Sequence, residues 1–72
     1  MSTDTLLNIT VNGDPRRVGA GATIGGMLRE IGIDPKRVAV ERNLSIVPKS
    51  MLEDVAVEDG DQFEIVHFVG GG

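Results

Sequence analysis

The chain of 72 residues has no cysteine, tryptophan or tyrosine, and its only aromatic side chains are Phe63 and Phe68. The absence of cysteine excludes disulfides, thiolate metal sites and a cysteine nucleophile. The core must therefore be built from valine, isoleucine, leucine and methionine. A chain this short is expected to form one domain and to bury too little surface to enclose a deep catalytic cleft. We therefore expect no enzymatic activity of its own.

Long apolar runs and an excess of basic side chains are also missing. No segment approaches the ~20 apolar residues that a membrane-spanning helix needs, and the polar first five residues do not resemble a secretion signal. Seven basic against eleven acidic residues give a net charge of −4, which repels nucleic-acid phosphates. We expect a cytoplasmic protein, monomeric when free, that binds neither membranes nor nucleic acid.

The first third of the chain has the pattern of a β-hairpin followed by a helix. Apolar and polar residues alternate over residues 6–11, Asn12-Gly13 is a strong turn signal, and a second strand is expected over 16–19. Thr23 is a suitable N-cap, and Gly32 is expected to end the helix. Between them, one apolar stripe follows the i, i+3, i+4, i+7 spacing: Ile24, Met27, Leu28 and Ile31.

The second half predicts three further strands, over residues 38–41, 46–47 and 62–68, the last one following an acidic turn at 58–61. The order of hairpin, helix and strands predicts an α+β fold of the ubiquitin-like β-grasp class. In this fold a mixed sheet of four to five strands surrounds one helix and leaves its other face open. We assign residues 1–68 to this single domain and residues 69–72 to a flexible glycine tail.

The sequence closes on Val69-Gly70-Gly71-Gly72, directly after the last predicted strand. Glycine has no Cβ, so four such residues can extend to about 13 Å and enter a channel too narrow for other side chains. A terminal carboxylate resists nucleophiles until it is activated, most simply by transfer of AMP from ATP. If sulfur is the nucleophile that attacks the acyl adenylate, AMP is displaced and a thiocarboxylate is left on Gly72.

Terminal glycines on an arbitrary domain are more often a frayed end or a cloning remnant. This tail, however, follows the last strand of a β-grasp pattern, and that combination is typical of ubiquitin-like carriers and modifiers. If Phe63 and Ile65 face the helix, alternate residues face the open side of the sheet, whereas a bulge or a register shift would exchange the two faces. We predict a partner-docking patch there, composed of Leu6, Val66, Phe68, Val69 and Gly70. The single histidine, His67, is expected to be a packed or surface strand residue, because one imidazole makes no metal site.

Three segments together resemble the ThiS family of sulfur carrier proteins. They are Val-Ala-Val-Glu-Arg-Asn at 38–43, Ile-Val-Pro-Lys-Ser at 46–50, and the run from Asp59 to Gly72. The resemblance carries over only Gly71 and Gly72 as functional residues. It implies that Gly72, presented by the tail with Gly71, is adenylated by a ThiF-type enzyme using ATP and converted to a thiocarboxylate with sulfur from a donor system. The sulfur would then pass to a ThiG-type thiazole synthase of thiamine biosynthesis. ATP would bind the activating partner, and this chain would bind no cofactor or metal.

Three other functions remain open at this point. The same thiocarboxylate chemistry serves molybdopterin synthase and could serve another pathway, although the short length and the residues from 41 to 48 favour the thiamine family by resemblance. A ubiquitin-like protein modifier would use the same activated tail but end in an amide bond to a lysine of its target. A simple binding module would use only its sheet face.

Overall fold

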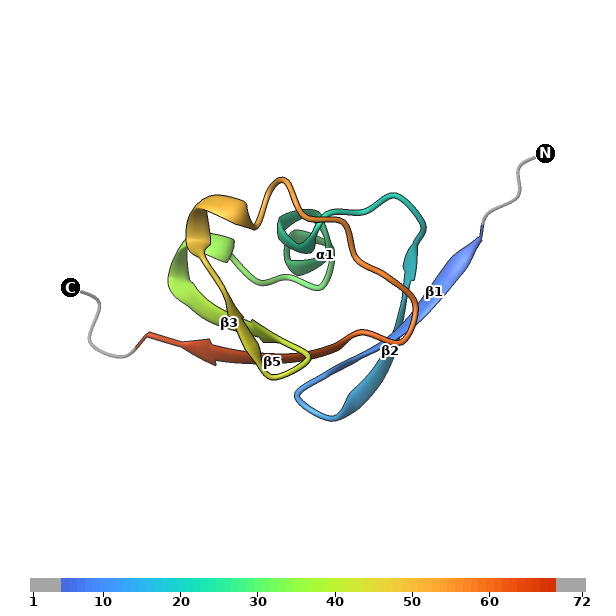
Figure 1. Cartoon of the computed structure of the whole chain (residues 1–72), viewed down its shortest axis with the longest axis horizontal. Helices are drawn as coiled ribbons and strands as arrows, with labels where there is room; N and C mark the ends of the chain where they lie inside the picture. The colour runs from blue at the N-terminus through green and yellow to red at the C-terminus, as the bar shows by residue number, and fades with distance from the viewer. Residues whose placement is uncertain (1–4, 69–72) are drawn as a thin grey trace.

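The computed structural model describes residues 5–68 and shows a mixed sheet packed against one α-helix (Figure 1). Within these residues the order along the sheet is β2-β1-β5-β3-β4. The strands are β1 (Leu6–Val11), β2 (Asp14–Gly19), β3 (Val38–Arg42), β4 (Ser45–Val47) and β5 (Gln62–His67). The helix is α1 (Ile24–Glu30), and two short 3-10 helices are η1 (Pro35–Arg37) and η2 (Lys49–Met51). The predicted β-grasp architecture is confirmed.

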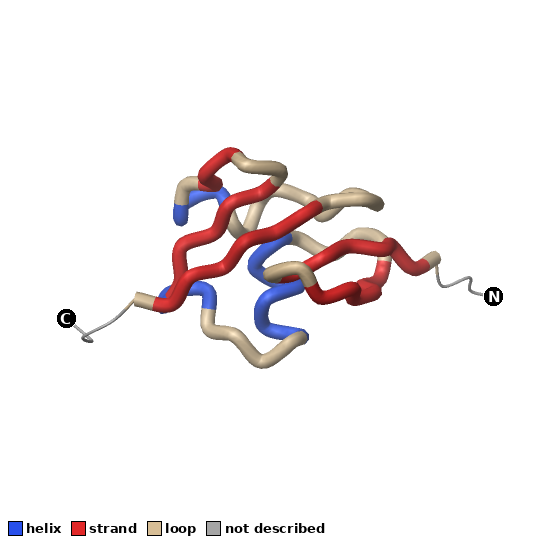
Figure 2. The backbone as a smooth tube through the Cα atoms, turned by 90° about the horizontal axis from the view of Figure 1, so that it is seen from below, coloured by secondary structure: helices blue, strands red, loops and turns tan. Residues whose placement is uncertain are grey.

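The last strand lies at the centre of the sheet. β5 runs parallel to β1 and antiparallel to β3, while β2 and β4 complete antiparallel hairpins at the two edges. Figure 2 views the molecule from below and shows the strands with α1 behind them. β1 and β5 are aligned only through the pairs Thr10–Gln62 and Val11–Phe63, so the two halves of the sheet meet over a short stretch.

Asn12 lengthens this short seam between β1 and β5. It adopts a left-handed backbone conformation with φ 51°, which suits an asparagine in a hairpin turn. Its side-chain Oδ1 accepts a hydrogen bond from the N–H of Ile65 at 2.7 Å, and its Nδ2 donates to the carbonyl of Ile65 at 3.1 Å. The amide side chain therefore takes the place of a strand residue beyond the end of β1.

Both ends of α1 follow the sequence prediction. The Thr23 hydroxyl accepts a hydrogen bond from the N–H of Gly26 at 3.0 Å, and the loop after η2 supplies carbonyls to two further free N–H groups of the first turn. Gly32 follows the last turn with φ 88°, a conformation that glycine adopts without strain. Among residues 5–68 no helix combines the length and the apolar character that crossing a membrane requires.

The core lies between α1 and the concave face of the sheet. It consists of Ile9, Val11, Val18, Ile24, Met27, Leu28, Val38, Val40, Leu52, Val57, Phe63 and Ile65, with Ile31 partly buried at its edge. The predicted helix stripe and the inward direction of Phe63 and Ile65 are thus confirmed. Alternation along β5 consequently places Glu64 and Val66 on the open face of the sheet.

Candidate functional site

The candidate site is the end of β5, from which the predicted glycine tail continues. β5 ends at His67, one residue earlier than predicted, and His67 is exposed. The N–H of Phe68 donates a hydrogen bond to the carbonyl of Arg37 at 3.0 Å. Val69, Gly70, Gly71 and Gly72 lie outside the described residues, so the roles assigned to them stay predictions.

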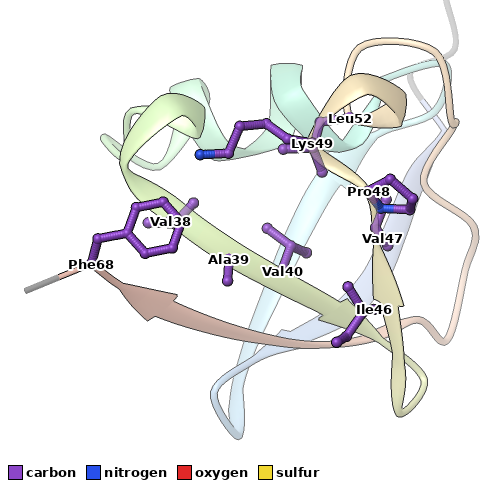
Figure 3. Close-up of a pocket in the computed structure, with 9 residues that line it drawn as sticks. All are labelled: Val38, Ala39, Val40, Ile46, Val47, Pro48, Lys49, Leu52 and Phe68. Carbon is purple, nitrogen blue, oxygen red and sulfur yellow. The ribbon is translucent and has the colours of Figure 1, made fainter. Parts of the chain in front are cut away.

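Phe68 does not lie on the open face beside Val66, so its predicted placement is wrong, while its contact with a partner stays a prediction. Its ring lies under the ammonium group of Lys49, with 4.4 Å between Nζ and the ring centroid, on the side of the sheet that carries η2 (Figure 3). Alternation of faces holds only for residues within the strand ladder. Phe68 follows the end of β5, so its side chain is free of that alternation.

The Phe68 ring closes one end of an apolar groove of about 170 Å³. The groove runs between β3, β4 and η2, and its lining includes Val38, Val40, Val47 and Leu52. Among its lining residues Lys49 alone carries a charge. The Lys49 ammonium also donates a hydrogen bond to the carbonyl of Lys36 at 2.9 Å, which ties η2 to η1 above the ring.

Leu6 does not lie beside Val66 or Phe68 either. β1 and β5 are parallel, and their register pairs Thr10 with Gln62. Leu6 comes four residues before Thr10 (10 minus 6) and Val66 comes four residues after Gln62 (66 minus 62). At about 3.3 Å per residue the two side chains are therefore roughly 26 Å apart along the strands. Whether Leu6 contacts a partner stays a prediction, but such a contact would lie at the far end of the domain.

The open face near the end of β5 is apolar and acidic. Val66 is 64% exposed and lies opposite Ala39, while Ile46 on β4 is 74% exposed. Between them Glu64 of β5 lies directly opposite Glu41 of β3. Neither carboxylate is within ion-pair distance of a cation in the part of the chain that the structure describes. Like charges in this arrangement repel each other, so this face combines exposed apolar area with local negative charge.

A buried carboxylate in the turn before β5 was missed by the sequence analysis. Asp61 is 4% exposed. Its carboxylate accepts hydrogen bonds from Arg42 Nε at 3.0 Å, Asn43 Nδ2 at 3.1 Å and the N–H of Glu58 at 2.8 Å. The network joins the β3–β4 hairpin to the start of β5, so its role is structural. No group of metal-ligating side chains occurs among residues 5–68.

A mixed sheet around one helix, whose central strand leads into a glycine run, defines a ubiquitin-like β-grasp protein. A solved protein designed on the template of human erythrocytic ubiquitin has the same fold, with a TM-score of 0.53 at 16% identity, covering 97% of this chain and 98% of that chain. At this identity the likeness shows the fold alone.

The chain belongs to the ThiS family, whose model matches residues 9–72. A crystal structure of thiamine biosynthesis protein ThiS from Geobacter metallireducens superposes with a TM-score of 0.73 at 31% identity, covering 92% of this chain and all of that chain. The sulfur carrier protein ThiS of Bacillus subtilis is 46% identical over 50 residues, which are 69% of this chain and 76% of that protein.

Two larger relatives are also similar to nearly the whole chain. A thiazole synthase of Paramagnetospirillum magneticum is 52% identical over 66 residues, and one of Magnetococcus marinus is 42% identical over 66 residues. In both cases the match covers 92% of this chain and 20% of the relative. The chain therefore spans about a fifth of the length of these thiazole synthases.

Proposed function

We propose that this chain is a sulfur carrier of thiamine biosynthesis and that it carries sulfur as a thiocarboxylate on Gly72. The observation that carries the proposal is the match to the ThiS family, which extends to residue 72. The fold supports it, because the end of β5 from which the tail continues is paired with β3, up to His67 opposite Val38, and the N–H of Phe68 donates a hydrogen bond to the carbonyl of Arg37. In this role the chain is a co-substrate of its partner enzymes.

The proposed loading takes two steps. A carboxylate oxygen of Gly72 attacks the α-phosphorus of ATP, displaces pyrophosphate and forms an acyl adenylate. A donor sulfur at the oxidation level of sulfide then attacks the carbonyl carbon and displaces AMP, leaving a thiocarboxylate. A ThiF-type enzyme supplies the ATP site and the donor system supplies the sulfur. This chain contributes a terminus without side chains, which lets the reacting carbon be approached closely.

The proposed acceptor of the sulfur is a ThiG-type thiazole synthase. Support comes from the two thiazole synthases that contain a segment similar to this chain over 66 residues. A carrier-like domain and a synthase that share one polypeptide are held at high effective concentration. We infer that this chain and a separate synthase perform the same transfer by docking to each other.

The surface proposed for docking is the open face around Val66. Val66 and Ile46 supply exposed apolar area, and the Glu41–Glu64 pair supplies negative charge beside it. A partner with an apolar centre and basic side chains at the rim would bury the apolar residues and relieve the carboxylate repulsion. Val69 and Gly70 would continue this contact toward the reaction site.

Intact mass spectrometry tests the proposal directly. The protein is incubated with a ThiF-type enzyme, ATP and a sulfur donor, and its mass is compared with that of a reaction without ATP. We expect an ATP-dependent exchange of one oxygen for one sulfur. Conjugates of higher mass would instead show a protein modifier, and an unchanged mass would leave only a binding module.

A further inference from the structure

The residue that immediately precedes the proposed tail is anchored at two points, on its backbone and on its side chain. The N–H of Phe68 donates a hydrogen bond to the carbonyl of Arg37. The ring packs under the Lys49 ammonium at 4.4 Å, and this ammonium is itself held by the carbonyl of Lys36. Residues from η1, η2 and the end of β5 thus converge on the point where the tail begins (Figure 3).

These contacts contribute little to the stability of the domain. Phe68 is 57% exposed, and it lies outside the buried core. A cation–π contact at such an exposed site is weak. The arrangement therefore fixes the orientation of Phe68 more than it stabilises the fold.

We propose that the contact between Lys49 and Phe68 is a positioning clamp that sets the direction in which the chain leaves the domain toward the active site of the adenylating partner. The inference rests on the proposed function. Phe68 is the last described residue before Val69 and the glycine run, so the orientation of its backbone sets the direction in which the chain leaves the described domain. If only a fraction of the molecules hold this direction, the apparent affinity for the partner falls by that fraction. The clamp would keep the fraction high and so preserve the affinity.

The clamp predicts a specific kinetic pattern. Lys49→Met keeps the unbranched stem but removes the charge, and Phe68→Leu removes the aromatic face. Because an exposed cation–π contact corresponds to about a two- to five-fold change in an equilibrium, each variant should raise the KM for the carrier in adenylation by that factor. The kcat should stay unchanged, because a tail that has reached the active site reacts normally. ATP–pyrophosphate exchange with a ThiF-type enzyme measures both constants.

Matched variants separate the clamp from direct contact with the enzyme. Lys49→Arg and Phe68→Tyr keep the cation–π contact and should retain a KM close to that of the original protein. The double variant with Lys49→Met and Phe68→Leu should be no worse than either single variant, since both remove the same contact. Additive losses would show two independent enzyme contacts and overturn the proposal, as would an unchanged KM in both single variants.

One measurement reads the clamp without any enzyme. Amide hydrogen exchange at Phe68, whose N–H is bonded to Arg37, should become faster in Lys49→Met and stay unchanged in Lys49→Arg. Equal exchange in all three proteins overturns the clamp. If exchange responds as expected but the original protein is not adenylated, the proposed function fails and the clamp loses its role, although the contact between Lys49 and Phe68 stands. If Phe68→Leu does not fold, the comparison of Lys49→Met with Lys49→Arg still decides the outcome.

Discussion

At the scale of single residues, backbone conformation distinguishes two positions in the β3–β4 turn. Asn43 and Leu44 both have positive φ, at 50° and 73°, which is the pattern of a two-residue type I′ turn. Asparagine tolerates this conformation, but a leucine is strained there. Leu44 is also 88% exposed, so no burial within the described domain offsets the strain.

Leu44→Gly should therefore stabilise the domain. Glycine adopts positive φ freely, and we expect the free energy of unfolding to rise by about 1 kcal/mol, allowing for the greater freedom of glycine in the unfolded chain. Urea denaturation measures this free energy of unfolding. Leu44→Ala is the control, because it removes the apolar side chain but keeps the strained backbone. A glycine variant no more stable than the alanine variant would contradict the assignment of strain.

The ion pair between Arg29 and Glu53 gives the domain a defined response to acid. The two guanidinium nitrogens of Arg29 bond the two carboxylate oxygens of Glu53, each at 2.7 Å. The hydrogen bond from Arg29, aided by its positive charge, lowers the pKa of Glu53 in the folded protein. The unfolded chain therefore takes up the proton first, and the stability contributed by the pair is lost as the pH falls from the usual glutamate pKa of about 4.3 through the lower folded pKa.

Glu53→Gln should remove this acid-dependent contribution. The variant is expected to melt at a lower temperature than the original protein near neutral pH, and the difference should vanish in acid below the folded pKa. Thermal unfolding followed by circular dichroism across this pH range measures the difference. Asp54→Asn serves as the control, because Asp54 forms no ion pair within residues 5–68. A difference that persists in strong acid would show that the pair does not act through ionisation.

At the scale of elements, local patterns identified the strands and the helix but not how the strands lie against each other. The 6–11 strand and the helix stripe behind Thr23 are confirmed because period and capping are encoded by neighbouring residues. The position of Leu6 depends on the parallel register between β1 and β5, which links residues more than fifty positions apart. No local period carries this information, so the predicted neighbourhood of Leu6 was wrong.

The end of β5 shows the same limit at closer range. Alternation placed Phe68 on the open face, but the ladder ends at His67 and the ring packs with Lys49 of η2. Contacts between side chains of different elements redirect a residue once the strand stops. The buried Asp61 was likewise recognised only as a turn residue, although a preceding Arg42-Asn43 pair supplies two of its donors.

The open face of the sheet yields a prediction in which stability and docking change in opposite directions. Glu64→Lys replaces the repulsion with Glu41 by an attraction, and a favourable cross-strand pair contributes roughly 0.5 kcal/mol. The variant should unfold at a higher temperature. Its association with a ThiF-type enzyme should nevertheless be slower, and more so at low salt, because the docking face has lost negative charge.

Stopped-flow association at two salt concentrations checks this second effect. Glu30→Lys is the matched control, because it makes the same change in net charge on α1, which packs on the opposite face of the sheet. Association that slows equally in both variants would indicate a general effect of net charge and would contradict docking through the open face.

At the scale of the whole molecule, the proposed function assigns the reaction to the C-terminal glycine run and the docking to the folded domain. The central strand β5 ends at His67, with two residues between it and the glycine run, and the apolar and acidic face lies beside the last residues of this strand. The fold itself was predictable from the sequence. Few topologies are compatible with a small set of apolar residues, one amphipathic helix and several short strands. The proposed reaction rests on the family pattern alone, since residues 69–72 carry no side chain that identifies sulfur as the nucleophile.

The central claim is that the sulfur is attached to Gly72. After incubation with a ThiF-type enzyme, ATP and a sulfur donor, tandem mass spectrometry of the C-terminal peptide locates the incorporated sulfur. The account predicts that it lies on the carboxyl group of Gly72 and that a variant lacking Gly72 folds normally but gains no sulfur. Sulfur found on another residue, or incorporated into the shortened chain, would contradict it.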